Sequence, residues 1–237
     1  MFTSTKTTFT PSTDIPSLKD KVIMVTGGNS GLGKQSIVEL AKHRPKEVWL
    51  AARDPKRAAA AVTSIKCDLV EPVDIKILDM DLTSLDSVKR AAERFRSESS
   101  RLDILLLNAD GMNTVARYGQ SKLANLLWGR EMARHYPQLT VPLVHPGLVR
   151  TNLATTMGQG SLIMRILWWI ASLVTGVDVE TGTLNQLWAA TYPRVESGQY
   201  YVPVGKTRNG SKYAQDLGLG KKLWEWTEME LEAYLNG

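Results

Sequence analysis

The segment from Thr26 to Gly33, TGGNSGLG, constrains the fold most, because it joins an apolar run to a segment with helical spacing. The run Lys21–Thr26 is apolar and β-branched, and Lys34–His43 repeats its apolar residues with the period of a helix. Only glycine lets a backbone turn tightly and approach a pyrophosphate, whose charge the helix N-terminus then meets. The alternative is a glycine turn kept for steric reasons alone. The pattern predicts a dinucleotide site formed by Gly27, Asn29, Ser30, Gly31, Leu32 and Gly33.

The same alternation of strand and helix continues along the chain. Further strands are predicted at Glu47–Ala52, Asp74–Leu78, Leu102–Leu107, Leu139–Val144 and Gln199–Val204, and helices at Pro55–Ile65, Ser84–Phe95, Arg117–Tyr136, Val179–Ala190 and Leu219–Leu235. Such alternation is typical of an α/β protein with a doubly wound, parallel, Rossmann-type sheet. The continuous apolar run of Leu102–Leu107 predicts a strand that is buried on both faces. We expect a flexible N-terminal segment, residues 1–17, and a single NAD(P)-binding Rossmann domain, residues 18–237.

Composition excludes several other classes of protein. The 237 residues, 43% of them hydrophobic, suffice for one large α/β domain, and no apolar run has the length of a membrane-spanning helix. The single cysteine, Cys67, excludes an internal disulfide and a multi-cysteine zinc site, and we expect it to be buried or half-buried. The three histidines lack metal-ligand spacing, so no metal is predicted. The N-terminal residues fit neither a signal peptide nor a transit peptide, which favours a cytoplasmic location.

The residues after the second and third strands bear on the choice of cofactor. Arg53 stands about where an NAD-binding protein usually carries an acidic residue, and a guanidinium can hold a 2′-phosphate by paired hydrogen bonds. NADP is therefore favoured over NAD, although a solvated arginine neutralised by Asp54 is the alternative. The net charge of +5 is spread along the chain, which suits a phosphorylated cofactor and does not indicate nucleic-acid binding. Asp81 and Leu82 are expected to meet the adenine ring, or else to form a helix-capping loop.

Tyr118 and Lys122 lie four residues apart, so they share one face of the helix that they begin. A tyrosine titrates at about pH 10, and a fixed ammonium one turn away stabilises the phenolate and lowers this pKa. The pair is thus suited to acid–base catalysis near neutral pH. Two residues that meet this spacing by chance on a solvated helix face are the alternative.

Taken together, these motifs resemble the short-chain dehydrogenase/reductase family, in its retinol-dehydrogenase-like branch. The resemblance covers nearly the whole chain after Ser17, and its motifs occur in family order: the TGxxxGxG turn, Ala-Arg-Asp after the second strand, Asp81-Leu82, Asn108-Ala109, YGQSKLANLLW around Tyr118, and His145-Pro146-Gly147 with Thr151 beyond. It implies an oxidoreductase in which Tyr118 is the catalytic acid/base, while Lys122 lowers the pKa of Tyr118 and holds the nicotinamide ribose. It also implies cofactor contacts from Asn108, Pro146, Gly147, Val149 and Thr151.

The chain departs from the family pattern between Asn108 and Tyr118, which only nine residues separate. The family has several tens of residues there, with a helix that carries a catalytic Asn and a strand that carries a catalytic Ser. The sheet is therefore predicted to be short by one strand and one helix. It either closes, which moves the Tyr118 helix by roughly 4.8 Å, or keeps a gap with two exposed strand edges. The alternative function is a catalytically impaired nucleotide-binding protein, a truncated or mis-spliced form.

Tryptophans gather in the C-terminal half, where the family builds its substrate wall: Trp128, Trp168, Trp169, Trp188, Trp224 and Trp226. They favour a lipophilic carbonyl or alcohol as the small-molecule substrate, and the alternative is that each ring packs in the core. The apolar stretch Ser161–Val174 is too short to span a membrane and is interpreted as a substrate lid rather than a membrane-surface segment. The oligomeric state stays open, because one of the two helices through which family members pair is missing.

Overall fold

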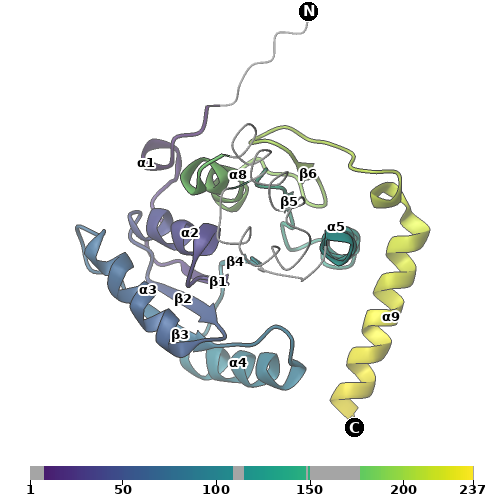
Figure 1. Ribbon diagram of the computed structural model, residues 1–237, viewed down its shortest axis with the longest axis horizontal. Helices are drawn as coiled ribbons and strands as arrows, with labels where there is room; N and C mark the ends of the chain where they lie inside the picture. Colours follow the sequence, from purple (N-terminus) through teal and green to yellow (C-terminus); the bar gives the residue numbers. More distant parts are fainter. Residues whose placement is uncertain (1–7, 109–114, 148, 150–176, 237) are drawn as a thin grey trace, which may run out of the picture.

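The computed structural model describes residues 8–108, 115–147, 149 and 177–236, with the backbone alone for 115–118 (Figure 1). The helices are α1 Pro11–Asp14, α2 Gly31–Ala41, α3 Pro55–Cys67, α4 Leu85–Glu98, α5 Val115–His135, α8 Val179–Thr191 and α9 Leu217–Asn236, with a 3-10 turn at Tyr213–Gln215. The strands are β1 Val22–Thr26, β2 Glu47–Ala52, β3 Ile75–Asp79, β4 Ile104–Leu106, β5 Leu143–Val144 and β6 Tyr200–Tyr201.

The main sheet has four parallel strands in the order β3-β2-β1-β4. All residues of β1 and β2 are buried, because helices cover both faces of these strands. Helices α2, α3 and α8 pack over the face that carries Ile23, Val25 and Leu50. Helix α4 covers the opposite face, where its Phe95 ring meets Trp49 edge-on at 5.1 Å. The predicted doubly wound α/β fold with a parallel sheet is thus confirmed.

The sheet is interrupted after β4. Strand β4 pairs with β1, whereas β5 pairs with β6 in a separate two-stranded parallel sheet. Of the two outcomes expected for a chain short of one strand, this is the gap. Both β5 and β6 are only two residues long, so the predicted strands Leu139–Val144 and Gln199–Val204 were too long. Strands β5 and β6 each pair with one neighbour, so fewer of their residues are held in extended conformation than in a wider sheet.

The prediction that the fourth strand is buried on both faces was wrong. Leu105 is 44% exposed and Leu107 is 67% exposed. Ile104 and Leu106, which point to the other face, pack against the main core. Helix α4 covers its face of the sheet over β1, β2 and β3, so the leucines on the outermost strand lie beyond it.

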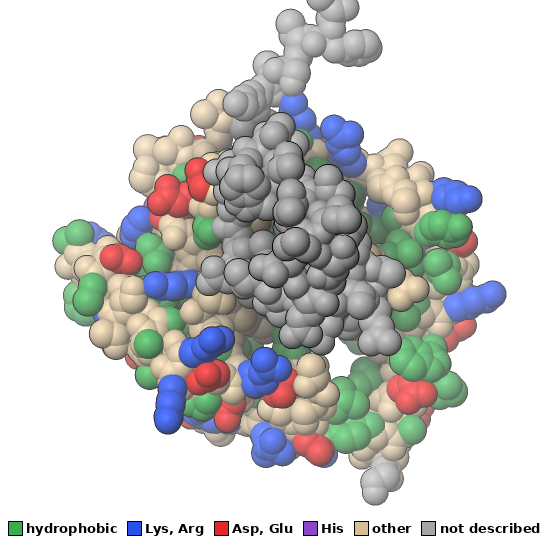
Figure 2. Space-filling view, viewed as in Figure 1, with side chains coloured by type: hydrophobic (Ala, Val, Ile, Leu, Met, Phe, Trp, Pro, Cys, Tyr) green, Lys and Arg blue, Asp and Glu red, His purple; other side chains and the backbone are tan. Residues whose placement is uncertain are grey.

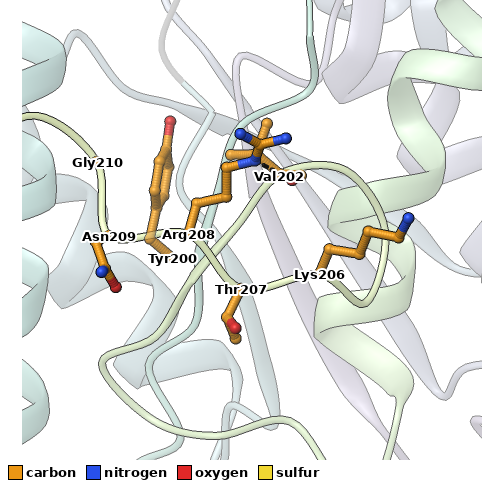
Figure 3. A pocket seen from close by; sticks show the side chains of 7 residues that line it. All are labelled: Tyr200, Val202, Lys206, Thr207, Arg208, Asn209 and Gly210. Atoms are coloured by element: carbon orange, nitrogen blue, oxygen red, sulfur yellow. Dashed lines mark hydrogen bonds between the residues drawn. The ribbon is translucent and has the colours of Figure 1, made fainter. Parts of the chain in front are cut away.

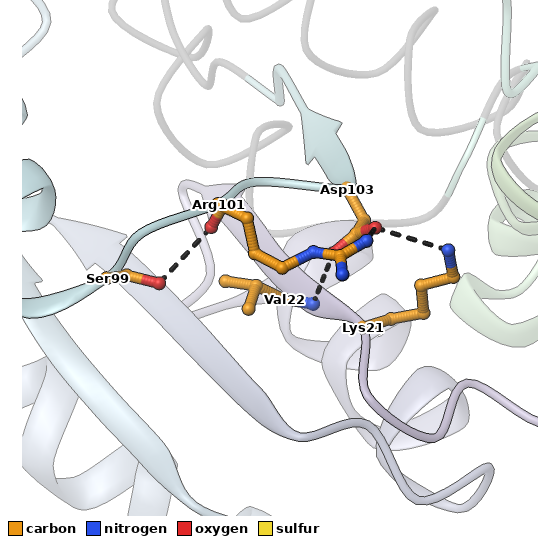
Figure 4. Close-up of polar contacts among 5 residues, drawn as sticks. All are labelled: Lys21, Val22, Ser99, Arg101 and Asp103. Atoms are coloured by element: carbon orange, nitrogen blue, oxygen red, sulfur yellow. Dashed lines mark hydrogen bonds and ion pairs between the residues drawn. The ribbon is translucent and has the colours of Figure 1, made fainter.

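The amino end of β4 is fastened to β1 by Asp103 (Figure 4). Its carboxylate accepts hydrogen bonds from the backbone N–H of Val22 at 2.9 Å, from Lys21 Nζ at 3.2 Å and from Arg101 Nε at 2.9 Å. Burial by itself raises the pKa of Asp103, but these three donors outweigh it and lower the pKa to about 2. The carboxylate therefore stays charged where the two strands join.

Helices α5 and α9 form a second packing unit beside β5. Trp224 of α9 stacks on Trp128 and His135 of α5, with ring centroids 5.4 Å and 4.5 Å apart. Gly129 of α5 lies against Leu143 of β5, where a Cβ would approach a leucine methyl to 2.3 Å. Trp188 and Trp224 are buried, so these two rings pack in the core, which was the alternative to a substrate wall. Trp168 and Trp169, with the predicted lid, lie outside the described residues.

Two smaller expectations also change. Residues 8–17, part of the segment predicted to be flexible, contain α1 and bury Phe9 and Ile15 in the main core, because these apolar side chains cover α8 and the sheet. Cys67 is exposed, since it ends α3 on the solvent side. Among the described residues, no helix is long and apolar enough to cross a bilayer.

Candidate functional site

The glycine turn has the backbone geometry that the sequence predicts. Gly27 and Gly31 have φ values of +61° and +51°, which L side chains rarely adopt. A Cβ on Gly33 would lie 2.3 Å from the carbonyl oxygen of Gly27, so no larger residue fits there without moving the turn. Helix α2 begins at Gly31, and its N-cap, Ser30, makes no side-chain capping bond. The Ser30 side chain therefore leaves the first N–H groups of α2 uncapped at a glycine-rich turn, which suits a phosphate.

Asn108, which follows β4, packs against this turn. The Thr26 hydroxyl donates to the Asn108 carbonyl at 2.7 Å, and the Asn108 N–H donates to the same hydroxyl oxygen at 2.9 Å. The Asn108 side chain packs so closely that a Cβ on Gly27 or Gly33 would be 2.9 Å from its Nδ2. The structure thus brings Asn108 together with the glycine turn, because both follow the carboxyl ends of the neighbouring parallel strands β4 and β1.

Arg53 is exposed at the carboxyl end of β2, beside the glycine turn. Asp54 does not neutralise it: the Asp54 carboxylate caps α3 by accepting from the N–H groups of Lys56 and Arg57. Among the described residues Arg53 makes no ion pair within 4 Å, although its charge helps to lower the pKa of Asp81. The guanidinium is therefore free to meet an anion.

The loop after β3 caps a helix, which is one of the two alternatives considered for it, and contact with adenine stays a prediction. Asp81 accepts hydrogen bonds from the backbone N–H and the hydroxyl of Thr83 at 3.0 Å and 2.8 Å, and these bonds are the main cause of its lowered pKa. Ser84 caps α4 by accepting from the Ser87 N–H. Leu82, 49% exposed, leaves an apolar side chain on the surface after β3. The loop does cap a helix, and it also presents an apolar surface at the sheet edge.

Tyr118 lies in α5, one turn before Lys122, as predicted, but its side chain is outside the described residues. Lys122 lies near His145, which follows β5: burial first, and then the positive charge of Lys122, lowers the pKa of His145. The ring nitrogen Nδ1 of His145 accepts a hydrogen bond from the Gly147 N–H at 2.9 Å. An imidazole that accepts at Nδ1 is neutral, so Lys122 carries the positive charge at this end of β5.

The residues after β5 reach the glycine turn through α8. Val149 and Leu32 both lie against Gly182, where a Cβ would be 2.5 Å from a Val149 methyl and 3.2 Å from a Leu32 methyl. Thr151 lies outside the described residues. Sequence reasoning missed Asn185 and Gln186 of α8, two buried polar residues that bond to both segments. Their helix buries polar and apolar residues together, so no periodic pattern marks them.

A further hollow of about 740 Å³ lies on another part of the surface (Figure 3). It is lined by Tyr200, Val202, Lys206, Thr207, Arg208, Asn209 and Gly210, and none of the predicted cofactor contacts is among them. Burial raises the pKa of Tyr200. Basic side chains on the face shown in Figure 2 are scattered among acidic ones rather than gathered in one patch. Within the described ranges, no group of three or more His, Cys, Asp or Glu is placed to hold a metal.

Comparison with known proteins gives a consistent picture. Residues 21–117 match the family model of the short chain dehydrogenases, and the match ends directly before Tyr118. The chain is 28% identical to a short-chain dehydrogenase/reductase of Aspergillus calidoustus, over 92% of this chain and 95% of that protein. It is 24% identical to human retinol dehydrogenase 14, over 88% of this chain and 85% of that protein.

The fungal alignment spans 304 residues, whereas this chain has 237, so the relative contains several tens of residues without a counterpart here. Among solved structures, L-sorbose reductase from Gluconobacter frateurii complexed with NADPH and L-sorbose has a TM-score of 0.66 at 18% identity, over 84% of this chain and 100% of that chain. The Pseudomonas aeruginosa RhlG/NADP complex has a TM-score of 0.63 at 19% identity, over 80% and 96%. Both likenesses concern the fold.

Proposed function

Since the chain belongs to the short-chain dehydrogenase/reductase family, we propose that it transfers a hydride between NADP(H) and a lipophilic carbonyl or alcohol. NAD(P)-dependent oxidoreduction is the activity of the family. The observation that carries the proposal is the cradle at the start of α2, where Gly33 approaches the Gly27 carbonyl too closely for any side chain. A diphosphate fits such a cradle, because backbone N–H groups and the positive end of the helix dipole both face it.

The preference for NADP is supported by the surroundings of Arg53. Its guanidinium is exposed beside the turn, while the neighbouring carboxylate of Asp54 is used by the N-terminus of α3. A 2′-phosphate accepts two parallel hydrogen bonds from a guanidinium, and a ribose hydroxyl does not supply the matching charge. We propose that Arg53 selects the phosphorylated cofactor.

The proton chemistry is assigned to α5. We propose that the Tyr118 hydroxyl exchanges a proton with the substrate oxygen and that the Lys122 ammonium, one helical turn away, stabilises the phenolate. The neutral state of His145 supports this assignment, because a second cation beside Lys122 would weaken the ammonium's own charged state. When bound, the dinucleotide supplies or accepts the hydride. A lipophilic substrate is supported by relatives that are named retinol dehydrogenases.

A second candidate function is favoured by the interrupted sheet. Strand β4 and strand β5 do not pair, and the residues that the family uses for its catalytic Ser and Asn have no counterpart between Asn108 and Tyr118. Loss of one donor to the developing oxyanion costs about a hundredfold or more in rate. On this alternative the chain binds the dinucleotide without turning over a substrate.

Two measurements on one purified sample separate these functions. NADPH is titrated by tryptophan fluorescence, and its oxidation is then followed with a panel of aldehydes and ketones. We expect Gly33→Ala to abolish binding and the matched Gly218→Ala, which meets only the Asp216 side chain, to retain it. Turnover that disappears in Tyr118→Phe supports the oxidoreductase, and binding without any turnover supports the second candidate. Binding that survives Gly33→Ala unchanged would refute the assigned site.

A further inference from the structure

The two parts of the proposed cofactor site lie on different sheets. The glycine half-site, Gly27–Gly33, follows β1 of the main sheet, and the β5 half-site, His145–Gly147 with Val149, follows β5 of the small sheet. Because β4 and β5 do not pair, no ladder among the described strands fixes the distance between these half-sites. Some other element must align them before one ligand can contact both.

Helix α8 packs on both sheets and on α2. Gly182, near its start, lies between the half-sites, and a Cβ there would come within 2.5 Å of Val149 and 3.2 Å of Leu32. Gly182, Asn185 and Gln186 stand three and four residues apart, so they share one face of the helix. This face is the surface that both half-sites contact.

Asn185 fixes the β5 half-site. It is 3% exposed, and its Nδ2 donates to the carbonyl oxygens of His145 and Tyr201, each at 2.9 Å. These two residues end or follow β5 and β6, so one amide holds the end of the small sheet. Its Oδ1 is buried without a hydrogen-bond partner among the described residues, so Asn185 acts through the two bonds that its Nδ2 donates.

Gln186 fixes the glycine half-site from the next position of the same helix. Its Nε2 donates to the Leu32 carbonyl at 3.1 Å and to the Ser36 hydroxyl, which in turn donates to Leu32 O at 2.8 Å. Leu32 lies in the first turn of α2, directly after Gly31 of the cradle. Consecutive residues of α8 thus bond to opposite halves of the site.

We infer that α8 aligns the two half-sites, with Gly182, Asn185 and Gln186 as positioning residues that let one dinucleotide contact both. The inference rests on the proposed dinucleotide binding. It predicts that disturbing this face of α8 weakens a ligand that spans both half-sites and spares a ligand that contacts the glycine half-site alone. A purely structural role would weaken both ligands alike.

The test compares the Kd values of NADPH and of 2′,5′-ADP by titration calorimetry. We expect Asn185→Leu to raise the NADPH Kd by about tenfold or more, the equivalent of one hydrogen bond, and to leave the 2′,5′-ADP Kd within about twofold. The matched control is Thr183→Val, since Thr183 is fully buried on the same helix, but among the described residues its hydroxyl bonds only to Val179 O of that helix. Thr183→Val should change neither Kd.

Equal weakening of both ligands by Asn185→Leu, or no change in either, overturns the inference. Should that variant lack a cooperative melt, Gly182→Ala provides the same comparison, because its methyl group displaces Val149 without removing a polar group. A wild-type chain that binds neither ligand refutes the proposed dinucleotide binding itself, and the inference with it. If the wild-type chain binds both ligands and Asn185→Leu leaves the ratio of the two Kd values unchanged, only the inference about α8 is refuted, and the proposed dinucleotide binding stands.

Discussion

Replacing Asp103 with asparagine tests how firmly β4 is held at the edge of the main sheet. The Asp103 side chain is 9% exposed and accepts from Lys21, Arg101 and the Val22 N–H, which together lower its pKa from 3.8 to about 2. At about 1.4 kcal/mol for each pKa unit, the charged carboxylate contributes about 2 kcal/mol to the free energy of unfolding. This contribution is complete above the unfolded-state pKa and is lost as the pH falls from about 4 to about 2.

The assay is urea denaturation, followed by tryptophan fluorescence at several pH values. We expect Asp103→Asn to be less stable than wild type by about 2 kcal/mol at pH 7, with the two stabilities converging near pH 2. Glu71→Gln is the control: its ion pair with Arg44 is as short, 2.6 Å, but the side chains are 54% and 70% exposed, so it should cost at most about 1 kcal/mol. A difference for Asp103→Asn that is equally small, or that does not change with pH, would refute the reasoning.

Two further outcomes follow from single side chains. Arg53→Ser should raise the NADPH Kd by about tenfold or more while leaving the NADH Kd nearly unchanged, as measured by fluorescence titration, because only NADPH has a 2′-phosphate; equal effects on both cofactors would contradict the assignment. Trp224→Ala should lower the free energy of unfolding by about 3–5 kcal/mol in urea, because a ring that is 7% exposed and stacked on Trp128 and His135 leaves a cavity, and a loss below about 1 kcal/mol would show that α9 does not pack on α5 as described.

The main sheet and the glycine turn could be predicted because local patterns determine them. The runs at β1 and β2 are mostly apolar, and the turn between β1 and α2 itself requires glycine at Gly27, Gly31 and Gly33. Asp54 is instructive. From sequence it was a possible partner for Arg53, but a carboxylate directly before Pro55 also caps a helix, and the two N–H groups of α3 hold it more closely.

The parts that could not be predicted depend on contacts between distant segments. The exposure of Leu105 and Leu107 depends on which elements neighbour β4. An apolar sequence is compatible with a central strand and with an edge strand, so it does not predict this exposure. Asn185 and Gln186 likewise lie in a helix without a periodic polar pattern, and only the assembled structure places the carbonyl groups of Leu32, His145 and Tyr201 within their reach. Local chemistry thus identifies the cradle, whereas alignment of its second half is a tertiary property.

The last prediction concerns β4, an edge strand of the main sheet. Leu105 and Leu107 are exposed, whereas Ile104, whose side chain points to the opposite face of the same strand, packs against the main core. We expect the double variant Leu105→Lys, Leu107→Lys to change the free energy of unfolding by less than about 0.5 kcal/mol and to reduce self-association, since an apolar strand edge pairs readily with other chains. Ile104→Lys should cost more, about 2 kcal/mol, because it places an unpaired ammonium against the apolar core. If the chain in solution closed its sheet over β4, both leucines would be covered, and the double variant would be as unstable as Ile104→Lys.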